Sequence, residues 1–85
     1  MMLKSEDGWL GTFTRQEADG AMVNGTRVYK FQSEPGDGHP TGSMGTVLGS
    51  LHHPDLGYMY FVEWDESPRV AIGVVERKIK KIEGN

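Results

Sequence analysis

The chain contains no cysteine, which excludes disulfide bonds and thiolate metal sites. It also lacks any apolar run approaching the roughly 20 residues that a membrane-spanning helix needs. Residues 1–7 carry two acids and no apolar h-region, so they do not match a secretory signal peptide. From these absences we expect a cytoplasmic protein that makes no contact with a membrane.

Motifs of known catalytic chemistry are also missing. The sequence has no Gly-x-Ser-x-Gly nucleophile elbow. A chain of 85 residues leaves little room for the supporting side chains that hold a nucleophilic triad in place. We therefore expect neither a catalytic site nor a cofactor, and the sequence favours a binding protein over an enzyme.

Histidines are the candidate metal ligands. His52 and His53 lie close to Asp55, and His39 precedes them in the chain. Imidazole and carboxylate groups suit zinc or nickel. Adjacent side chains in an extended segment point to opposite sides, however, so neighbouring histidines rarely hold one ion unaided. The sequence predicts a polar loop here and no metal site.

The main positive signal is the alternation of apolar and polar residues that is typical of strands. It is strongest over residues 58–65, where Tyr60, Val62 and Trp64 share one face and are predicted to enter the core. Four further strands are predicted at residues 25–31, 45–51, 70–74 and 79–82.

Between the strands, the glycines and prolines of residues 32–43 predict a long loop, and a second loop is predicted at residues 52–57. Residues 75–78 favour one helical turn. Residues 14–17 match a helix-capping box, but Gly20 follows closely, which leaves open whether a short helix forms there.

This order of elements resembles the SH3-like small β-barrels, which include the KOW and Tudor-like families. The residues that carry the resemblance are Gly25–Val28, Gly45–Val47, Tyr60–Asp65 and Val74–Ile79. It implies an all-β fold, a five-stranded SH3-like barrel over residues 24–85 with one short helical turn, preceded by an N-terminal arm of residues 1–23. Such barrels host many unrelated activities, so the fold alone does not give the function.

The plasmid-borne, trimethoprim-resistant type of dihydrofolate reductase has a similar scaffold and uses a Val-Gln-Ile-Tyr strand in its active pore. The matching stretch here is Val70–Gly73, in which alanine and glycine replace the glutamine and the tyrosine. Neither residue offers a side-chain donor or acceptor, so the reductase chemistry does not carry over.

A ligand site is predicted on the strongest strand. Tyr58 offers an aromatic ring for a cation or a peptide, and Glu63 and Asp65 favour a basic partner. The leading interpretation is therefore a small binding or adaptor module that recognises a protein or peptide.

The last segment of the chain is basic although the net charge is −3. The favoured interpretation is that these lysines protect an edge strand from pairing with another chain. The alternative is that the basic residues bind nucleic acid. A sequence pI near 5.5 counts against that alternative. The residues involved are Arg69, Arg77, Lys78, Lys80 and Lys81.

A second apolar face is predicted to lie outside the barrel and to be covered, because a broad exposed apolar surface usually marks an interface. One candidate cover is the N-terminal segment, with Trp9, Leu10, Phe13 and Met22. The other is a second subunit, and we expect a homo-oligomer that forms through this face with the help of the N-terminal arm. A further alternative is an oligomer that binds a small molecule or cofactor between its subunits. The predicted interface residues are Trp9, Phe13, Tyr29, Phe31, Met59 and Phe61.

Overall fold

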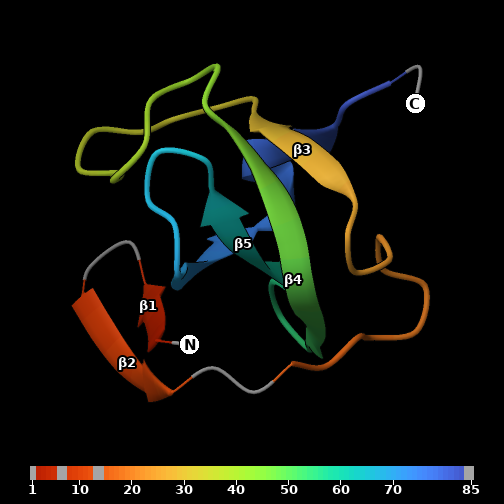
Figure 1. The fold of residues 1–85 in the computed structure, drawn as a ribbon. Coiled ribbons are helices and arrows are strands. Elements are labelled where there is room, and N and C mark those ends of the chain that lie inside the picture. Colours follow the sequence, from red (N-terminus) through yellow and green to blue (C-terminus); the bar gives the residue numbers. More distant parts are fainter. Residues whose placement is uncertain (1, 6–7, 13–14, 84–85) are drawn as a thin grey trace.

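The computed structural model describes residues 2–5, 8–12 and 15–83. They form one seven-stranded sheet and one 3-10 turn, η1, with the strands in the order β2-β1-β6-β5-β4-β3-β7 (Figure 1). The elements in chain order are β1 (Met2–Ser5), β2 (Gly8–Thr12), β3 (Arg27–Lys30), β4 (Met44–His53), β5 (Gly57–Trp64), β6 (Val70–Val75), η1 (Glu76–Lys78) and β7 (Ile79–Lys81).

The predicted all-β fold is confirmed. The five predicted strands correspond to β3 through β7, which pair antiparallel with one another, and the predicted helical turn is η1. The hairpin of β1 and β2 extends this sheet, because β1 runs parallel to β6. Figure 1 shows β4 crossing in front of β5, with the hairpin at the opposite side of the molecule from β3.

The main core lies on the predicted face of β5. Tyr60, Val62 and Trp64 are each at most 1% exposed, as their alternation along the strand predicts. Each large apolar side chain buried in this way contributes roughly 1.5 to 3 kcal/mol. The other buried members of this core are Val28, Val47, Ile72, Val74 and Ile79.

Phe61 is already buried within the single chain, whereas the sequence predicted an outward-facing ring that the N-terminal segment or another subunit would cover. It lies on the opposite face of β5 and packs in a second cluster with Leu48 and Ala71. A register shift between Val47 and Gly49 marks a bulge in β4 at this level. The prediction assumed one interior, whereas this sheet buries apolar side chains on both of its faces.

The other predicted interface residues differ in how far they are exposed. Phe31 is exposed, while Tyr29 and Met59 are half-buried. The side chain of Trp9 and all of Phe13 lie outside the described residues. Self-association through this set therefore stays a prediction.

The segment that leads from the hairpin to β3 has no helix over its described residues, 15–26, and Thr14, the first residue of the capping match, lies outside them. Hydrogen bonds to β4 hold this segment instead. The Ser50 N–H donates to the Gln16 carbonyl at 2.9 Å, and the Ala18 N–H donates to Ser50 Oγ at 2.9 Å. These tertiary contacts override the local capping signal.

Gly45 allows β4 to approach β5 closely. A Cβ atom at this position would lie 2.8 Å from the Glu63 carbonyl oxygen and 3.0 Å from the Trp64 ring. We expect Gly45→Ala to destabilise the protein by about 1 to 3 kcal/mol, because the two strands must separate. Urea unfolding measures this change.

The matched control is Gly73→Ala in β6, where a Cβ atom would meet the Phe61 ring at an ordinary 3.9 Å. This variant is expected to change the free energy of unfolding by less than about 0.5 kcal/mol. Equal losses in the two variants would contradict the close-approach explanation.

Candidate functional site

The structure separates the three predicted ligand-binding residues. Tyr58 lies near the start of β5 and Asp65 follows its end, so they are about 20 Å apart along an extended strand. Glu63 lies near Asp65 but accepts a hydrogen bond from the backbone N–H of Arg69 at 2.7 Å. Arg69 has a φ of 69°, and this bond supports the strained turn between β5 and β6.

Asp65 is engaged in a bidentate ion pair. Both guanidinium nitrogens of Arg27 donate to its carboxylate, at 2.8 and 2.6 Å. Arg27 also donates to Thr46 Oγ1 at 2.9 Å. The hydrogen bonds and charge of Arg27 hold the pKa of Asp65 below its ordinary value. Asp65 and Glu63 thus have structural partners within the chain.

Three of the predicted basic residues have partners within the chain. Arg77 donates to Glu34 at 2.6 Å, and the Lys80 ammonium lies 3.8 Å from the centre of the Phe31 ring. Lys78 is bound to a buried carboxylate described below. Arg69 lies in the turn after β5, and Lys81 is exposed on β7.

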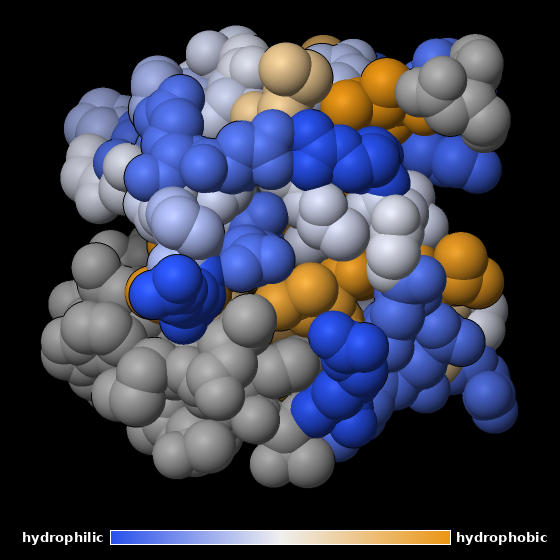
Figure 2. Space-filling view, viewed as in Figure 1, coloured by the Kyte–Doolittle hydropathy of each residue, from blue (hydrophilic) through white to orange (hydrophobic). Residues whose placement is uncertain are grey.

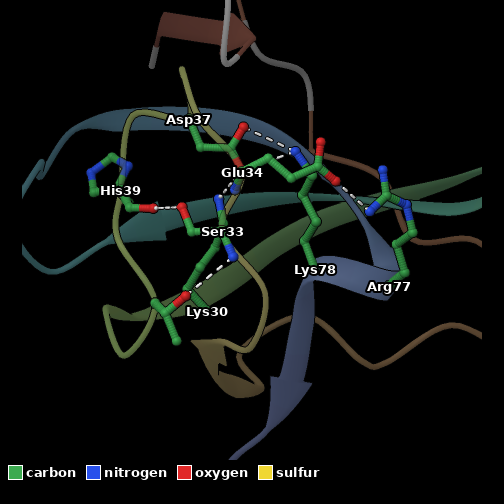
Figure 3. Close-up of polar contacts among 8 residues, drawn as sticks. Lys30, Ser33, Glu34, Asp37, His39, Arg77 and Lys78 are labelled. Carbon is green, nitrogen blue, oxygen red and sulfur yellow. Dashed lines mark hydrogen bonds and ion pairs between the residues drawn. The ribbon is translucent and has the colours of Figure 1, made fainter.

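A buried ion cluster anchors the long loop of residues 31–43, as Figure 3 shows. Lys30 is completely buried, and its ammonium lies 3.5 Å from Asp37 Oδ2. Lys78, on η1, donates to both Asp37 oxygens at 3.0 and 2.9 Å. The backbone N–H of Glu34 donates to the same carboxylate at 3.0 Å.

Burial acts to raise the pKa of Asp37, but the opposing interactions are stronger. Hydrogen bonds from the Glu34 N–H and the Lys78 ammonium, together with the Lys30 charge, hold this pKa below its ordinary value. One feature of the sequence indicates this cluster. Lys30 follows Val28 by two residues on the same strand, so its side chain shares the buried face of Val28.

The three histidines all have contacts within the chain. The His39 ring stacks on Trp64 with centroids 5.3 Å apart, and its Nε2 lies 3.0 Å from Ser67 Oγ. His52 lies edge-on to Tyr58, and His53 Nδ1 accepts the N–H of the residues in the following turn. The described residues include no group of three or more metal-ligating side chains.

Two hollows on the surface are both lined by Glu76, and we call the two together the Glu76 groove. The first has a volume of about 380 Å³ and the second about 520 Å³. His52, Leu56, Gly57, Tyr58, Val75 and Arg77 line the first hollow. Met22, Tyr29, Ile79, Lys80, Lys81 and Glu83 line the second.

The Tyr60 hydroxyl fixes Glu76 in this groove. It donates to Glu76 Oε2 at 3.1 Å and accepts the backbone N–H of Met22 at 2.9 Å. Burial and the neighbouring Glu76 carboxylate raise the pKa of Tyr60, so its hydroxyl stays protonated and able to donate. Glu76 is exposed and is a lining residue of both hollows.

Tyr58 also has a defined position beside the groove. Its hydroxyl donates to the Asp19 carbonyl at 2.7 Å, which joins β5 to the segment before β3. Gly20 has a φ of 81°, and a Cβ atom there would lie 2.5 Å from the Tyr58 oxygen. A glycine at this position is thus needed for the contact.

Four large apolar side chains of the described residues are exposed, and one of them, Leu56, lines the first hollow. Val23, Phe31, Met44 and Leu56 are the large apolar residues with the most exposure among the described side chains, at 44 to 62%. On the face seen in Figure 2, outside the grey atoms, apolar residues reach the surface in patches set among polar residues. The Glu76 groove is therefore the better candidate site, because it joins a hollow, aromatic rings and a fixed carboxylate.

Comparison of the chain with protein-family models, with curated proteins and with solved structures gives no match. In the described part of the chain, no helix is long and apolar enough to cross a membrane. The functional argument therefore depends on the site itself.

Proposed function

We propose that this chain is a non-catalytic module of the SH3-like type that binds a peptide segment of another protein in the Glu76 groove. The observation that carries the proposal is Glu76, an exposed residue that lines both hollows and whose carboxylate accepts a hydrogen bond from the Tyr60 hydroxyl. Their volumes fall in or near the range of typical ligand pockets, roughly 300 to 1,000 Å³.

The walls of the groove indicate the chemistry of the peptide. Tyr58 lines the first hollow and Tyr29 the second. Tyrosine provides a large contact area and loses little conformational freedom on binding. A lysine or arginine of the peptide would pair with Glu76, and an apolar residue on either side would contact a tyrosine ring.

Two observations favour a peptide over a nucleic acid. Arg77 and Lys78 are paired with acids of the long loop, which reduces their charge toward a phosphate. In the second hollow Glu76 and Glu83 offset the charges of Lys80 and Lys81, so its lining offers a phosphate no excess of positive charge.

A random-peptide phage library selected on the intact protein tests the proposal. We expect the enriched peptides to carry a basic residue beside an apolar one. Glu76→Gln keeps the shape of the side chain and removes its charge. We expect it to weaken the binding of these peptides about tenfold, because roughly one charge-assisted hydrogen bond is lost. Calorimetric titration with a synthetic enriched peptide measures the change.

Two controls separate the groove from general effects. Glu66→Gln makes the same change in net charge as Glu76→Gln, but it lies in an exposed turn outside the groove. It should therefore leave the peptide affinity unchanged. Tyr58→Phe keeps the ring, whereas Tyr58→Ala removes it, so only the alanine variant should lose most of the affinity. Peptides that bind wild type, Glu76→Gln and Tyr58→Ala equally would refute the groove as the binding site.

A further inference from the structure

Asn24 is followed directly by Gly25, in the turn that leads into β3. An asparagine side chain that precedes a glycine can react with its own backbone. The glycine nitrogen is not shielded by a side chain, and the glycine backbone rotates with little steric hindrance. The Asn24–Gly25 peptide is therefore a chemically reactive element that the Glu76 groove does not use.

The reaction of such a peptide has two steps. The Gly25 nitrogen attacks the side-chain carbonyl carbon of Asn24, and the new N–C bond closes a five-membered imide ring. The amide group of Asn24 leaves as ammonia, which takes up the proton of the Gly25 nitrogen. Water then adds to one of the two ring carbonyls and breaks one C–N bond, which gives aspartate or isoaspartate at position 24. In isoaspartate the main chain runs through the former side chain and is one carbon longer.

Two hydrogen bonds restrain the reacting groups in the folded chain. The Gly25 N–H donates to the Val47 carbonyl of β4 at 2.7 Å, so the attacking nitrogen is engaged. The Asn24 N–H donates to Glu17 Oε1 at 2.7 Å. An attack on the Asn24 side chain requires the Gly25 nitrogen to turn away from β4, which breaks the first of these bonds.

Once the bond to β4 is broken, few contacts oppose the reaction. A Cβ atom built on Gly25 would meet nothing within 4 Å apart from its chain neighbours, so the space around this residue is open. Asn24 Oδ1 is buried and accepts no hydrogen bond from the described residues, so no such bond holds the side-chain carbonyl in place. The bond from Gly25 to Val47 is therefore the main restraint on the reaction.

We propose that Asn24–Gly25 is a self-modification site whose reaction is gated by the hydrogen bond from Gly25 to β4. Local opening of residues 17–25 frees the nitrogen and leads to aspartate or isoaspartate at position 24. The product carries a new carboxylate near Glu17, whose Oε1 lies 2.7 Å from the backbone nitrogen of residue 24. Because like charges repel, the modification favours further opening, and it accumulates in molecules that have opened.

The segment that the modification loosens belongs to the packing of the fold. Ala21 and Met22 pack against the main core, and the Met22 N–H donates to the Tyr60 hydroxyl at 2.9 Å. Loosening of this segment therefore removes contacts from the core itself. The proposal does not depend on peptide binding, because neither Asn24 nor Gly25 lines the Glu76 groove, and either proposal can fail alone.

Peptide mapping by mass spectrometry is the first test, on wild-type protein incubated at mildly alkaline pH in buffer and in guanidinium chloride. Position 24 should gain the mass difference between an amide and an acid. The reaction should be at least about tenfold slower in the folded protein, because opening must come first. No product in the unfolded chain, or equal rates in the folded and unfolded protein, overturns the proposal.

Hydrogen exchange of the Gly25 amide in wild type provides an independent measure of the gate. Exchange of this amide and attack by its nitrogen both require the bond to Val47 to open. The protection factor of this amide should therefore match the ratio of the unfolded to the folded modification rate within about threefold. A ratio that differs widely from the protection factor overturns the gating mechanism.

Glu17→Ala removes the acceptor of the Asn24 N–H. We expect it to raise the modification rate of the folded protein about threefold, the effect of one exposed hydrogen bond, and to leave the unfolded rate unchanged. Glu66→Ala removes the same charge at an exposed turn and should change neither rate. Equal folded rates in wild type and Glu17→Ala overturn the restraint assigned to Glu17, and the wild-type exchange measurement decides the case where this variant fails to fold.

Asn24→Asp reproduces the charge of the product and tests whether modification loosens the segment. We expect the Gly25 amide to exchange about threefold faster in Asn24→Asp than in wild type, because the new carboxylate lies near Glu17. Asn24→Gln is the neutral control and should leave this exchange unchanged. Equal exchange in the two variants would refute the promotion of opening by the product.

Discussion

Replacing Asp37 by asparagine is expected to destabilise the folded protein by about 3 to 5 kcal/mol. The ammonium of Lys30 is 0% exposed and lies 3.5 Å from this carboxylate. Removal of the negative charge takes away the carboxylate that lies 3.5 Å from this buried ammonium. Urea unfolding followed by tryptophan fluorescence measures the loss.

The two lysines that contact Asp37 contribute differently to this effect. The side chain of Lys78 is 12% exposed and lies on the short η1 turn, so a small movement brings its ammonium to water. Lys30 lies on β3 between backbone partners, and its side chain has no such route. Most of the expected cost therefore arises from Lys30.

The double variant Lys30→Met/Asp37→Asn tests this assignment. It removes the buried cation together with its partner, and apolar replacement of a buried charge is often neutral or stabilising. We expect it to recover most of the stability lost in Asp37→Asn. Glu34→Gln, an exposed member of the same loop, should have a small effect. A double variant no more stable than Asp37→Asn would contradict the role given to Lys30.

The dependence on pH gives an independent check of the same cluster. The pKa of Asp37 is lower in the folded protein than its ordinary value of 3.8, so its contribution is present above pH 3.8 and is lost as the pH falls through the folded pKa. The stability difference between wild type and Asp37→Asn should therefore shrink in acid. A difference that stays constant below pH 3.8 would indicate that the carboxylate charge is not involved.

Local pattern was enough to predict the five strands that form the main sheet. Alternation places Tyr60, Val62 and Trp64 on one face, and burial of this face is what holds β5 in the core. The N-terminal hairpin was predicted only as an arm. The pairing of β1 with β6 joins residues 2–4 to residues 70–72. A local sequence pattern cannot predict a contact between residues so far apart in the chain.

The candidate site was less predictable because its key residues depend on partners distant in sequence. Tyr58 is predicted from the sequence as a ligand-binding ring, and the structure places it in the lining of a hollow. Glu63 and Asp65 were selected for their charge, but Arg69 and Arg27 engage them. Glu76 was missed, since its position is set by the hydroxyl of Tyr60, sixteen residues before it.

Replacing Trp64 by alanine is the second change for which we expect a loss of about 3 to 5 kcal/mol. Its side chain is 0% exposed and is the largest in the main core. The ring also supports the long loop, because His39 stacks on it at 5.3 Å and the Lys30 ammonium lies 5.5 Å from its centre. Circular dichroism during urea unfolding measures the loss without relying on this fluorophore.

Trp64→Phe is the matched variant, and its cost should be smaller, about 1 to 2 kcal/mol. Trp64 Nε1 is buried and has no hydrogen-bond partner among the described residues, so phenylalanine removes no such bond and retains a ring against His39. Hydrogen exchange then separates packing from loop support. If the ring anchors the loop, amides of residues 33–43 should exchange faster in Trp64→Ala than in Trp64→Phe, beyond the difference in global stability. Equal exchange rates after that correction would mean that Trp64 stabilises only the core and that the Asp37 cluster alone holds the loop.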